Sequence, residues 1–400
     1  MTLSSAFRTY WVGQGLSALG DAMTVIALPL VVFAETGSIA QMGALTAFAR
    51  GGGLVATALA GFIVDRWDPR RVLIACDVVR SVLMALVPLA WLCGIHGVVL
   101  VYAVAVGAAI AQGIHYVGHV SLVAGLVGRA HVGVANSRIE GTLALAYVFG
   151  PFAAGLISAE LGPRSVLGID SVTFFVSVLT LVVMGDSARP ERDPAPESRA
   201  STIGLDGLRF IRSHRELARL TILVAIGQFF TGSIVDLFIY RLKHDLRQSD
   251  AGAGVAFALA SMVAVLAAVA APRLRARISF RRIWIAAVLL QGLVLVVTSP
   301  SNSFALVLLT AACFMAAWTL LQICQASFRQ EVTPEHLLGR VSSSYLFLIA
   351  LPAPLGALLS TSLAARFGAA TVQAGVGAGL VATALLAAVI WVRTPRAETR

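Results

Sequence analysis

The sequence predicts an all-α membrane protein with twelve transmembrane helices, arranged as two pseudo-symmetric six-helix bundles. Hydrophobic residues make up 58% of the 400 residues and charged residues only 12%, whereas a soluble protein carries about 25% charged residues. Long apolar runs follow one another along the chain, each close to the roughly 20 residues that cross a bilayer as a helix. One long polar stretch near the middle separates six runs from six.

The individual runs are separated by short polar connectors. The first run contains polar residues throughout and lacks the small-residue cleavage site of a signal peptide, so we expect it to be a retained span. The expected spans are residues 9–34, 42–64, 72–93, 98–120, 136–158, 165–185, 217–240, 252–271, 282–299, 303–325, 340–364 and 369–392.

The placement of basic residues predicts that both termini are cytoplasmic. With the N-terminus inside, the inner segments hold 22 of the 30 Lys and Arg residues and the outer segments hold 5. Positive residues are retained on the cytoplasmic side of membrane proteins. The net charge of +10 is therefore a topology signal and does not indicate nucleic-acid binding. Twenty-nine of the 30 basic residues are Arg, which suggests a bacterial genome, and we expect a multi-pass protein of the bacterial inner membrane.

The polar stretch 186–216 defines three predicted parts: an N-terminal bundle over 1–185, a cytoplasmic linker, and a C-terminal bundle over 217–400. The first part of the linker is rich in Pro and charge, as flexible connectors are. Its second part, from Leu205, is amphipathic and predicts a helix on the inner membrane surface.

Short motifs recur in the same order in the two halves. Gly13-Gln14-x-x-Ser17 returns as Gly227-Gln228-x-x-Thr231, and Arg70-Arg71 returns as Arg281-Arg282. Internal repeats with a site at their interface are typical of secondary transporters. We therefore expect a duplicated six-helix unit.

Polar side chains recur at helical spacing on four of the runs. Such residues usually face a bundle interior or a watery cavity, and hydrogen bonding between helices is the alternative. The positions predicted to line a cavity are Gln14, Ser17, Asp21 and Thr24 in 9–34; Gln112, His115 and His119 in 98–120; Gln228 and Thr231 in 217–240; and Trp318, Gln322 and Gln325 in 303–325.

Three of these residues are predicted to carry protons. A carboxylate such as Asp21 in mid-bilayer costs about 2.5–3.5 kcal/mol on insertion scales, and burial favours its neutral form. A fixed ion pair with Arg50 is the alternative. His115 and His119 are four residues apart, but no third ligand can be assigned to them. Titration or substrate binding is therefore favoured over metal binding, and no cofactor is expected.

The other intramembrane charges have simpler interpretations. Asp77 and Arg80 are three residues apart on one helical face, which favours a structural ion pair with each other or with the second span. Asp170 and Asp236 lie near the predicted outer ends of their spans, where we expect solvated or capping carboxylates.

The connector between the second and third spans carries the most specific motif. It reads Gly61-x-x-x-Asp65-Arg66-x-x-x-Arg70-Arg71, and it resembles the loop 2–3 signature of the major facilitator superfamily of transporters. The resemblance implies a gating role for these residues, with Asp65 meeting the entry to the eleventh span near Gly339 and Arg340.

Further motifs extend this resemblance along the chain, to the branch that includes macrolide efflux pumps and the enterobactin exporter. The family fold implies that spans 1, 4, 7 and 10 line the central cavity. The motif at Gly150 resembles one found in drug/proton antiporters, with Ala154 where that pattern usually has Gly. The segments concerned are Gly13-Gln14-x-x-Ser17-x-x-Gly20-Asp21, Asp77-x-x-Arg80, Gly150-Pro151-x-x-Ala154-Gly155 and Pro334-Glu335-x-x-x-Gly339-Arg340.

The sequence contains no catalytic motif, such as a nucleophile elbow or a phosphate-binding loop, so we do not expect an enzyme. The resemblance implies a proton-coupled exporter of a small amphipathic compound, either a drug or a secondary metabolite such as a siderophore or antibiotic. A lipid flippase on the same fold and a nutrient importer are the alternatives. The expected partners are the substrate, protons and membrane lipid, with no nucleic acid, and a monomer is expected.

The predicted topology can be tested with reporter fusions. Fusions after residue 200 and at the C-terminus should both report a cytoplasmic location, because the basic residues lie mostly on that side. A fusion in the 241–250 connector should report the outside. An external C-terminus would contradict the model of twelve spans.

Overall fold

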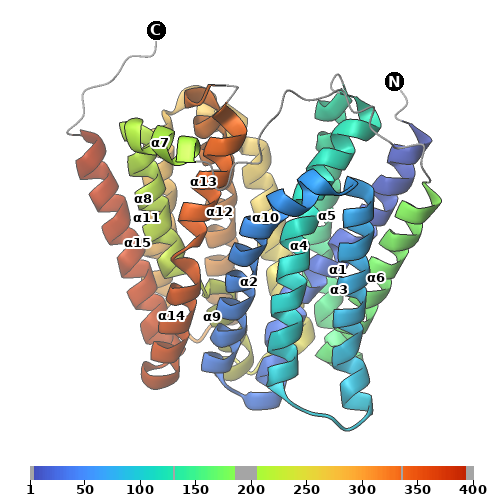
Figure 1. Cartoon of the computed structure of the whole chain (residues 1–400). Coiled ribbons are helices and arrows are strands. Elements are labelled where there is room, and N and C mark those ends of the chain that lie inside the picture. Colours follow the sequence, from blue (N-terminus) through green and yellow to red (C-terminus); the bar gives the residue numbers. More distant parts are fainter. Residues whose placement is uncertain (1–3, 129–130, 185–204, 335–336, 393–400) are drawn as a thin grey trace. The chain divides into compact units, whose positions relative to one another are not determined.

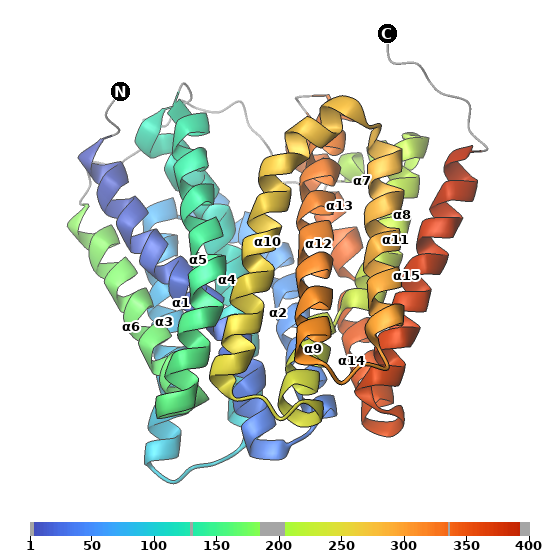
Figure 2. The ribbon, with the colours of Figure 1, turned by 180° about the vertical axis from the view of Figure 1, so that it is seen from behind.

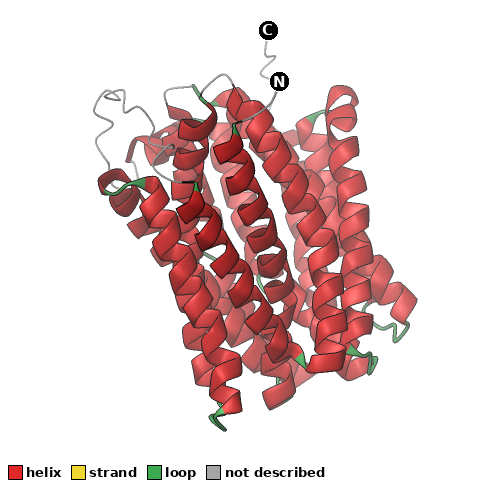
Figure 3. Cartoon of the chain, turned by 90° about the vertical axis from the view of Figure 1, so that its right-hand side faces the viewer, coloured by secondary structure: helices red, strands yellow, loops and turns green. Residues whose placement is uncertain are grey.

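In the computed structural model of the chain, the described residues are 4–128, 131–184, 205–334 and 337–392. Every regular element in these ranges is helical, and they contain no strand (Figure 3). The chain divides into two compact units. One comprises Met1–Thr202 with Gln248–Ala258, and the other comprises Ile203–Arg247 with Leu259–Arg400.

Among its described residues, the first unit contains six long helices and the start of a seventh (Figure 1). Ser4 caps the first helix by accepting a hydrogen bond from the backbone N–H of Phe7 at 3.1 Å. Asp68 caps the third in the same way through the N–H of Arg71 at 3.2 Å, and such caps satisfy the free amides of a helix start. The helices are α1 (Ser5–Thr36), α2 (Ile39–Arg66), α3 (Pro69–Leu92), α4 (Val98–Val127), α5 (Val132–Leu161) and α6 (Pro163–Val183).

Within this unit, α6 packs against both α1 and α3, and α4 packs against both α2 and α3. Small residues allow the close approach that membrane helices need. Gly13 of α1 lies against the side chain of Thr180, and Gly113 of α4 lies against Ala56. Beneath these contacts, Phe7, Tyr10 and Leu73 are fully buried and form part of one apolar cluster.

The second unit contains two interrupted spans. Its helices (Figures 1 and 2) are α7 (Leu205–Ser213), α8 (Arg215–Thr231), α9 (Ile234–Tyr240), the main part of α10 (Asp250–Arg277), α11 (Phe280–Thr298), α12 (Phe304–Val332), α13 (Leu338–Ala350), α14 (Ala353–Phe367) and α15 (Ala369–Val392).

The two interruptions pack against each other. Span 217–240 is divided between α8 and α9, and span 340–364 is divided between α13 and α14 beside Pro352, whose missing N–H favours a break. A Cβ on Gly232 would clash with the carbonyl of Ala353, and one on Gly356 would clash with the carbonyl of Phe229. The expectation that each span would be one continuous helix is therefore wrong at these two places.

A π-helical turn, Arg241–Asp245, follows α9. Arg241 is fully buried, and its guanidinium donates to Oε1 of Gln373 at 2.7 Å and to the carbonyl of Ser301 at 2.5 Å. This buried arginine belongs to the predicted outer connector 241–250, which holds three of the five outer basic residues. The buried hydrogen bonds of Arg241 give one of these three residues a structural role.

Among the described residues, eleven helical segments are long and apolar enough to cross a membrane. The helix α2 coincides with the predicted span 42–64 but is not one of the eleven, so the count of twelve remains a prediction. The helix α7 coincides with the predicted amphipathic segment and groups with the second unit. Most of the predicted linker, residues 185–204, lies outside the described residues.

The contact between the two interruptions predicts that one added methyl group, at Gly356, lowers the stability of the protein. Gly356→Ala should destabilise the protein by about 1–3 kcal/mol, the usual range for overpacking, because its Cβ would collide with the backbone of Phe229. The measurement is thermal unfolding in detergent.

The matched control for this prediction is Gly375→Ala in α15, where an added Cβ meets no atom within 4 Å. Equal melting temperatures for the two variants would show that the interruptions do not pack as described.

Candidate functional sites in the two units

A buried ion-pair cluster lies inside the first unit, between α1, α3, α4 and α6. The carboxylate of Asp21 pairs with the guanidinium of Arg80. The side chain of Arg80 is 3% exposed, whereas that of Asp21 is 30% exposed. Arg80 also lies 3.9 Å from Oδ1 of Asp77 and stacks on the ring of Phe174 at 3.9 Å.

Asp21 therefore has an ionic partner, Arg80, other than the predicted alternative, Arg50. The cation that pairs with Asp21 comes from α3, because α1 and α3 both pack along α6. The sequence predicted that Arg80 would pair with Asp77 or with the second span. Arg80 serves both carboxylates, since one guanidinium has five N–H donors.

Asp77, fully buried, connects the cluster to α4 and α6. Ser177 donates to its Oδ2 at 2.7 Å, and Nε2 of His115 lies 3.4 Å from its Oδ1. The amide of Gln14 donates to Ser177 at 3.2 Å and lies 3.5 Å from Nε2 of His115. The structure thus brings together the predicted residues Gln14, Asp21 and His115, together with Ser177, which the sequence did not single out.

Other predicted residues lie beside this cluster or apart from it. His119 makes its hydrogen bond through Nδ1 with the hydroxyl of Tyr10. Ser17 is buried at 3% exposure, whereas Gln112 is on an exposed face of α4. His115 and His119 therefore have different partners, although they are only four residues apart: His115 lies beside Asp77 and His119 bonds Tyr10. Gln112 is not part of the buried cluster.

Asp170 of α6 is a second carboxyl group at this site, and its predicted solvated position is wrong. It is fully buried and accepts hydrogen bonds from Thr24 at 2.6 Å and from Thr173 at 3.1 Å. Because α6 begins at Pro163, Asp170 lies two helical turns inside it. Asp236 is likewise 1% exposed, so its predicted position at the surface is also wrong.

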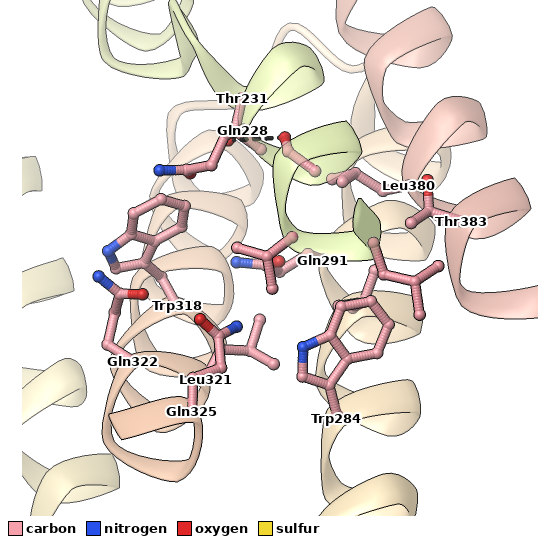
Figure 4. A pocket seen from close by; sticks show the side chains of 14 residues that line it. Gln228, Thr231, Trp284, Gln291, Trp318, Leu321, Gln322, Gln325, Leu380 and Thr383 are labelled. Atoms are coloured by element: carbon pink, nitrogen blue, oxygen red, sulfur yellow. Dashed lines mark hydrogen bonds between the residues drawn. The ribbon is translucent and has the colours of Figure 1, made fainter. Parts of the chain in front are cut away.

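A small neutral pocket lies inside the second unit (Figure 4), between α8, α11, α12 and α15. Its cavity of about 30 Å³ has room for one or two water molecules. Five predicted residues line it: Gln228, Thr231, Trp318, Gln322 and Gln325.

Three further lining residues that carry a polar atom in the side chain were not predicted: Trp284, Gln291 and Thr383. They come from α11 and α15, which show no marked polar stripe in the sequence. Nε1 of Trp284 is buried and makes no hydrogen bond, so the pocket holds a donor without an acceptor. Gln325 accepts a hydrogen bond from the hydroxyl of Tyr345 at 3.2 Å.

The two sites lie on helices of the same order in their units but differ in chemistry. The first uses spans 1, 3, 4 and 6 of its half, and the second uses the corresponding helices α8, α11, α12 and α15. Charged groups fill the first site, whereas amides and indoles line the second.

The repeated arginine pair also has matched contacts. Arg70 donates to the carbonyls of Leu181 and Val182 at the end of α6, at 2.7 and 3.0 Å. Arg281 donates to the carbonyl of Trp391 at the end of α15, at 3.4 Å. Each arginine therefore binds the C-terminal carbonyls of the last helix in its own half, where a cation is favoured by the helix dipole.

The remaining gating residues have local contacts. The guanidinium of Arg66 lies 3.8 Å from the ring centre of Phe62, and the backbone N–H of Arg71 donates to the cap of α3. Arg340 pairs with Asp206 of α7 at 2.7 Å, beside Gly339, which has open space around its Cα. The side chain of Asp65 and the surroundings of Gly61 lie outside the described part of the structure.

The antiporter-like motif lies where α5 meets two neighbours in the first unit. Gly150 lies against Ala22 of α1, next to Asp21. Pro151 is inside α5, and Gly155 lies against Gly254 in the first turns of α10. These close approaches require residues without bulky side chains.

The family of the chain follows from its sequence as a whole. A family model described as Major Facilitator Superfamily matches residues 10–357. The chain belongs to the Major Facilitator Superfamily. Members of this family are membrane transporters, so the protein is a transporter and not an enzyme.

Two curated relatives bear the name "Multidrug efflux pump Tap". The one from Mycobacterium tuberculosis (strain ATCC 25618 / H37Rv) is 28% identical over 391 residues, covering 93% of this chain and 90% of the relative. The one from Mycolicibacterium fortuitum is 27% identical over 364 residues, covering 87% of each.

Solved structures of transporters share the fold. The nucleoside transporter NupG superposes with a TM-score of 0.80 at 12% identity, covering 98% of this chain and all of that one. The D-xylose–proton symporter gives a TM-score of 0.75 at 15% identity, covering 98% of both chains. These similarities establish the fold alone.

Proposed function

We propose that this member of the superfamily is an efflux pump that exports small amphipathic compounds, either drugs or secondary metabolites, by proton antiport with alternating access. The observation that carries the proposal is the chemical difference between the two sites. The first unit contains titratable groups around Asp21, and the second contains an uncharged pocket. Proton binding and substrate binding thus have separate places. The names of the relatives support the direction of transport.

Coupling at Asp21 is supported by its position and its partner. Its partial exposure of 30% lets protons reach it, while Arg80 is buried and shared with Asp77. Protonation of Asp21 would remove a negative charge from a low-dielectric site and would release Arg80 from one of two partners. Such a change alters the balance between conformations, because charges interact strongly where water is excluded.

Recognition of an amphipathic compound is supported by the lining of the second site. Trp284 and Trp318 offer aromatic surface, and Gln228, Gln291 and Gln322 offer amide donors and acceptors. Pockets of this kind orient mainly apolar ligands through a few polar groups. The present cavity admits only water, so we infer that substrate entry requires the four helices to separate.

For the connector between α2 and α3, we propose a gating role that involves Asp65 and Arg66 together with Arg340 of α13. The helix start at Arg340 is favourable for a carboxylate by about 0.3–1 kcal/mol. The bond between Arg340 and Asp206 ties this helix start to α7, so movement of α13 would carry α7 with it.

The proposed coupling role predicts the behaviour of Asp21→Asn. The variant should lose uphill transport driven by a pH gradient, since Asn cannot exchange a proton, and should retain counterflow exchange. The measurement uses proteoliposomes with ethidium and a radiolabelled macrolide as probes. Glu160→Gln, which neutralises an exposed acid on α5, is the control.

Three results of this experiment would decide against parts of the proposal. Unimpaired pH-driven transport by Asp21→Asn would move the coupling role to His115 or His119. Probe movement that is independent of pH in the wild type would favour the lipid flippase, and net uptake against a gradient would favour the importer. Loss of folded protein would assign the pair of Asp21 and Arg80 a structural role.

The proposed gating role predicts the behaviour of Asp65→Asn. This variant should slow both counterflow and uphill transport several-fold with little change in the amount of folded protein, because the contact would form in one conformation only. The same proteoliposomes measure both rates. Rates equal to those of the wild type would remove Asp65 from the gate.

A further inference from the structure

Asp170 has an environment that differs from those of the other two carboxyl groups near it. Asp21 pairs with Arg80, and Asp77 lies within 4 Å of both Arg80 and His115. Asp170, by contrast, is fully buried, and its two hydrogen-bond partners are the hydroxyls of Thr24 and Thr173. No cation forms an ion pair with it among the residues that the structure describes.

A buried carboxylate without a cation is costly, and the usual response is to take up a proton. The hydroxyl of Thr24 fits either protonation state, because it can donate to a carboxylate or accept from a carboxylic acid after rotating. Thr24 can therefore stay hydrogen-bonded to Asp170 in both protonation states.

The charges facing Asp170 come from two helices. Asp21 of α1 and Arg80 of α3 act on it electrostatically, and the carboxyl group lies directly against Gly20, the residue before Asp21. The third helix packed against α6 is α5. Its Tyr147 interacts electrostatically with Asp21. Arg80 thus pairs with Asp21 and lies within ion-pair distance of Asp77, and it acts on Asp170 only through its field.

Counting the charges of the cluster gives the same result. Three ionised carboxylates beside one guanidinium would leave a net charge of −2, which a low-dielectric interior does not tolerate. A proton on Asp170 reduces this net charge to −1. Oδ1 of Asp77 and Nε of Arg80 are buried without a hydrogen-bond partner, which leaves one acceptor and one donor of the cluster for a water molecule.

We propose that Asp170 is a second proton-binding site of the transporter, and that its proton exchanges with one on Asp21 because both groups compete for the charge of Arg80. When Asp21 takes up a proton, the field of Arg80 acts on Asp170, which then releases its own. One proton is bound and one released, and Arg80 stays charged throughout. This inference extends the proposed antiport but is tested without transport.

The experiment is infrared difference spectroscopy of the full-length protein in lipid as a function of pH. The wild type should show a carboxylic-acid C=O band at neutral pH, which Asp170→Asn should lose and Asp170→Glu should retain at a shifted frequency. Glu160→Gln, at an exposed position, should leave the band unchanged. An identical band in Asp170→Asn and the wild type would overturn the proposal.

Two further variants test the exchange. Asp21→Asn removes the competing negative charge, so the band should disappear at a pH lower by about one unit or more, the usual effect of an available Arg. Thr24→Val removes a donor to the carboxylate, so the band should persist to higher pH. This second variant keeps Asp170 itself and decides the question if Asp170→Asn does not fold. An unchanged midpoint in either variant would overturn the exchange.

The outcomes also separate this inference from the proposed function. If the band behaves as expected but a pH gradient does not drive transport by the wild type, the antiport proposal fails and the proton site stands. If the band is absent while pH-driven transport is normal, the antiport proposal stands and Asp170 is a structural residue.

Discussion

The interior of the first unit depends on one buried guanidinium, that of Arg80. It pairs with Asp21, lies within ion-pair distance of Asp77 and stacks on Phe174, so it joins α1, α3 and α6 through one side chain. Removal of one partner from such a buried pair typically costs about 3–5 kcal/mol. The same residue therefore supports the structure and provides the charge on which any proton chemistry of Asp21 and Asp170 must depend.

The second unit shows what the same helical framework does without that charge. On the corresponding helices, Gln228, Gln291 and Gln325 surround a small cavity beside the indole of Trp284. Amides and indoles need no counter-ion, so the site can be empty, hydrated or occupied without a large electrostatic cost.

The second unit also differs in backbone continuity. Its first and fifth spans are interrupted next to Gly232 and Pro352, and the interruptions contact each other. The matching helices of the first unit, α1 and α5, are continuous despite Pro29 and Pro151. Discontinuous helices often mark the places where transporters bind substrate and bend, which fits a substrate role for the second unit.

The fold class and the succession of spans could be predicted from the sequence, because hydropathy and helical spacing are local properties. The same is true of Trp318 and Gln325, which share one face of α12. The burial of individual carboxyl groups, their ionic partners and the positions of the helix breaks were decided by the tertiary structure. Which cation pairs with Asp21 depends on how α1 and α3 meet α6, and the burial of Asp170 depends on where α6 begins. These are contacts between residues 59 and 146 positions apart, and spacing along one helix carries no information about them.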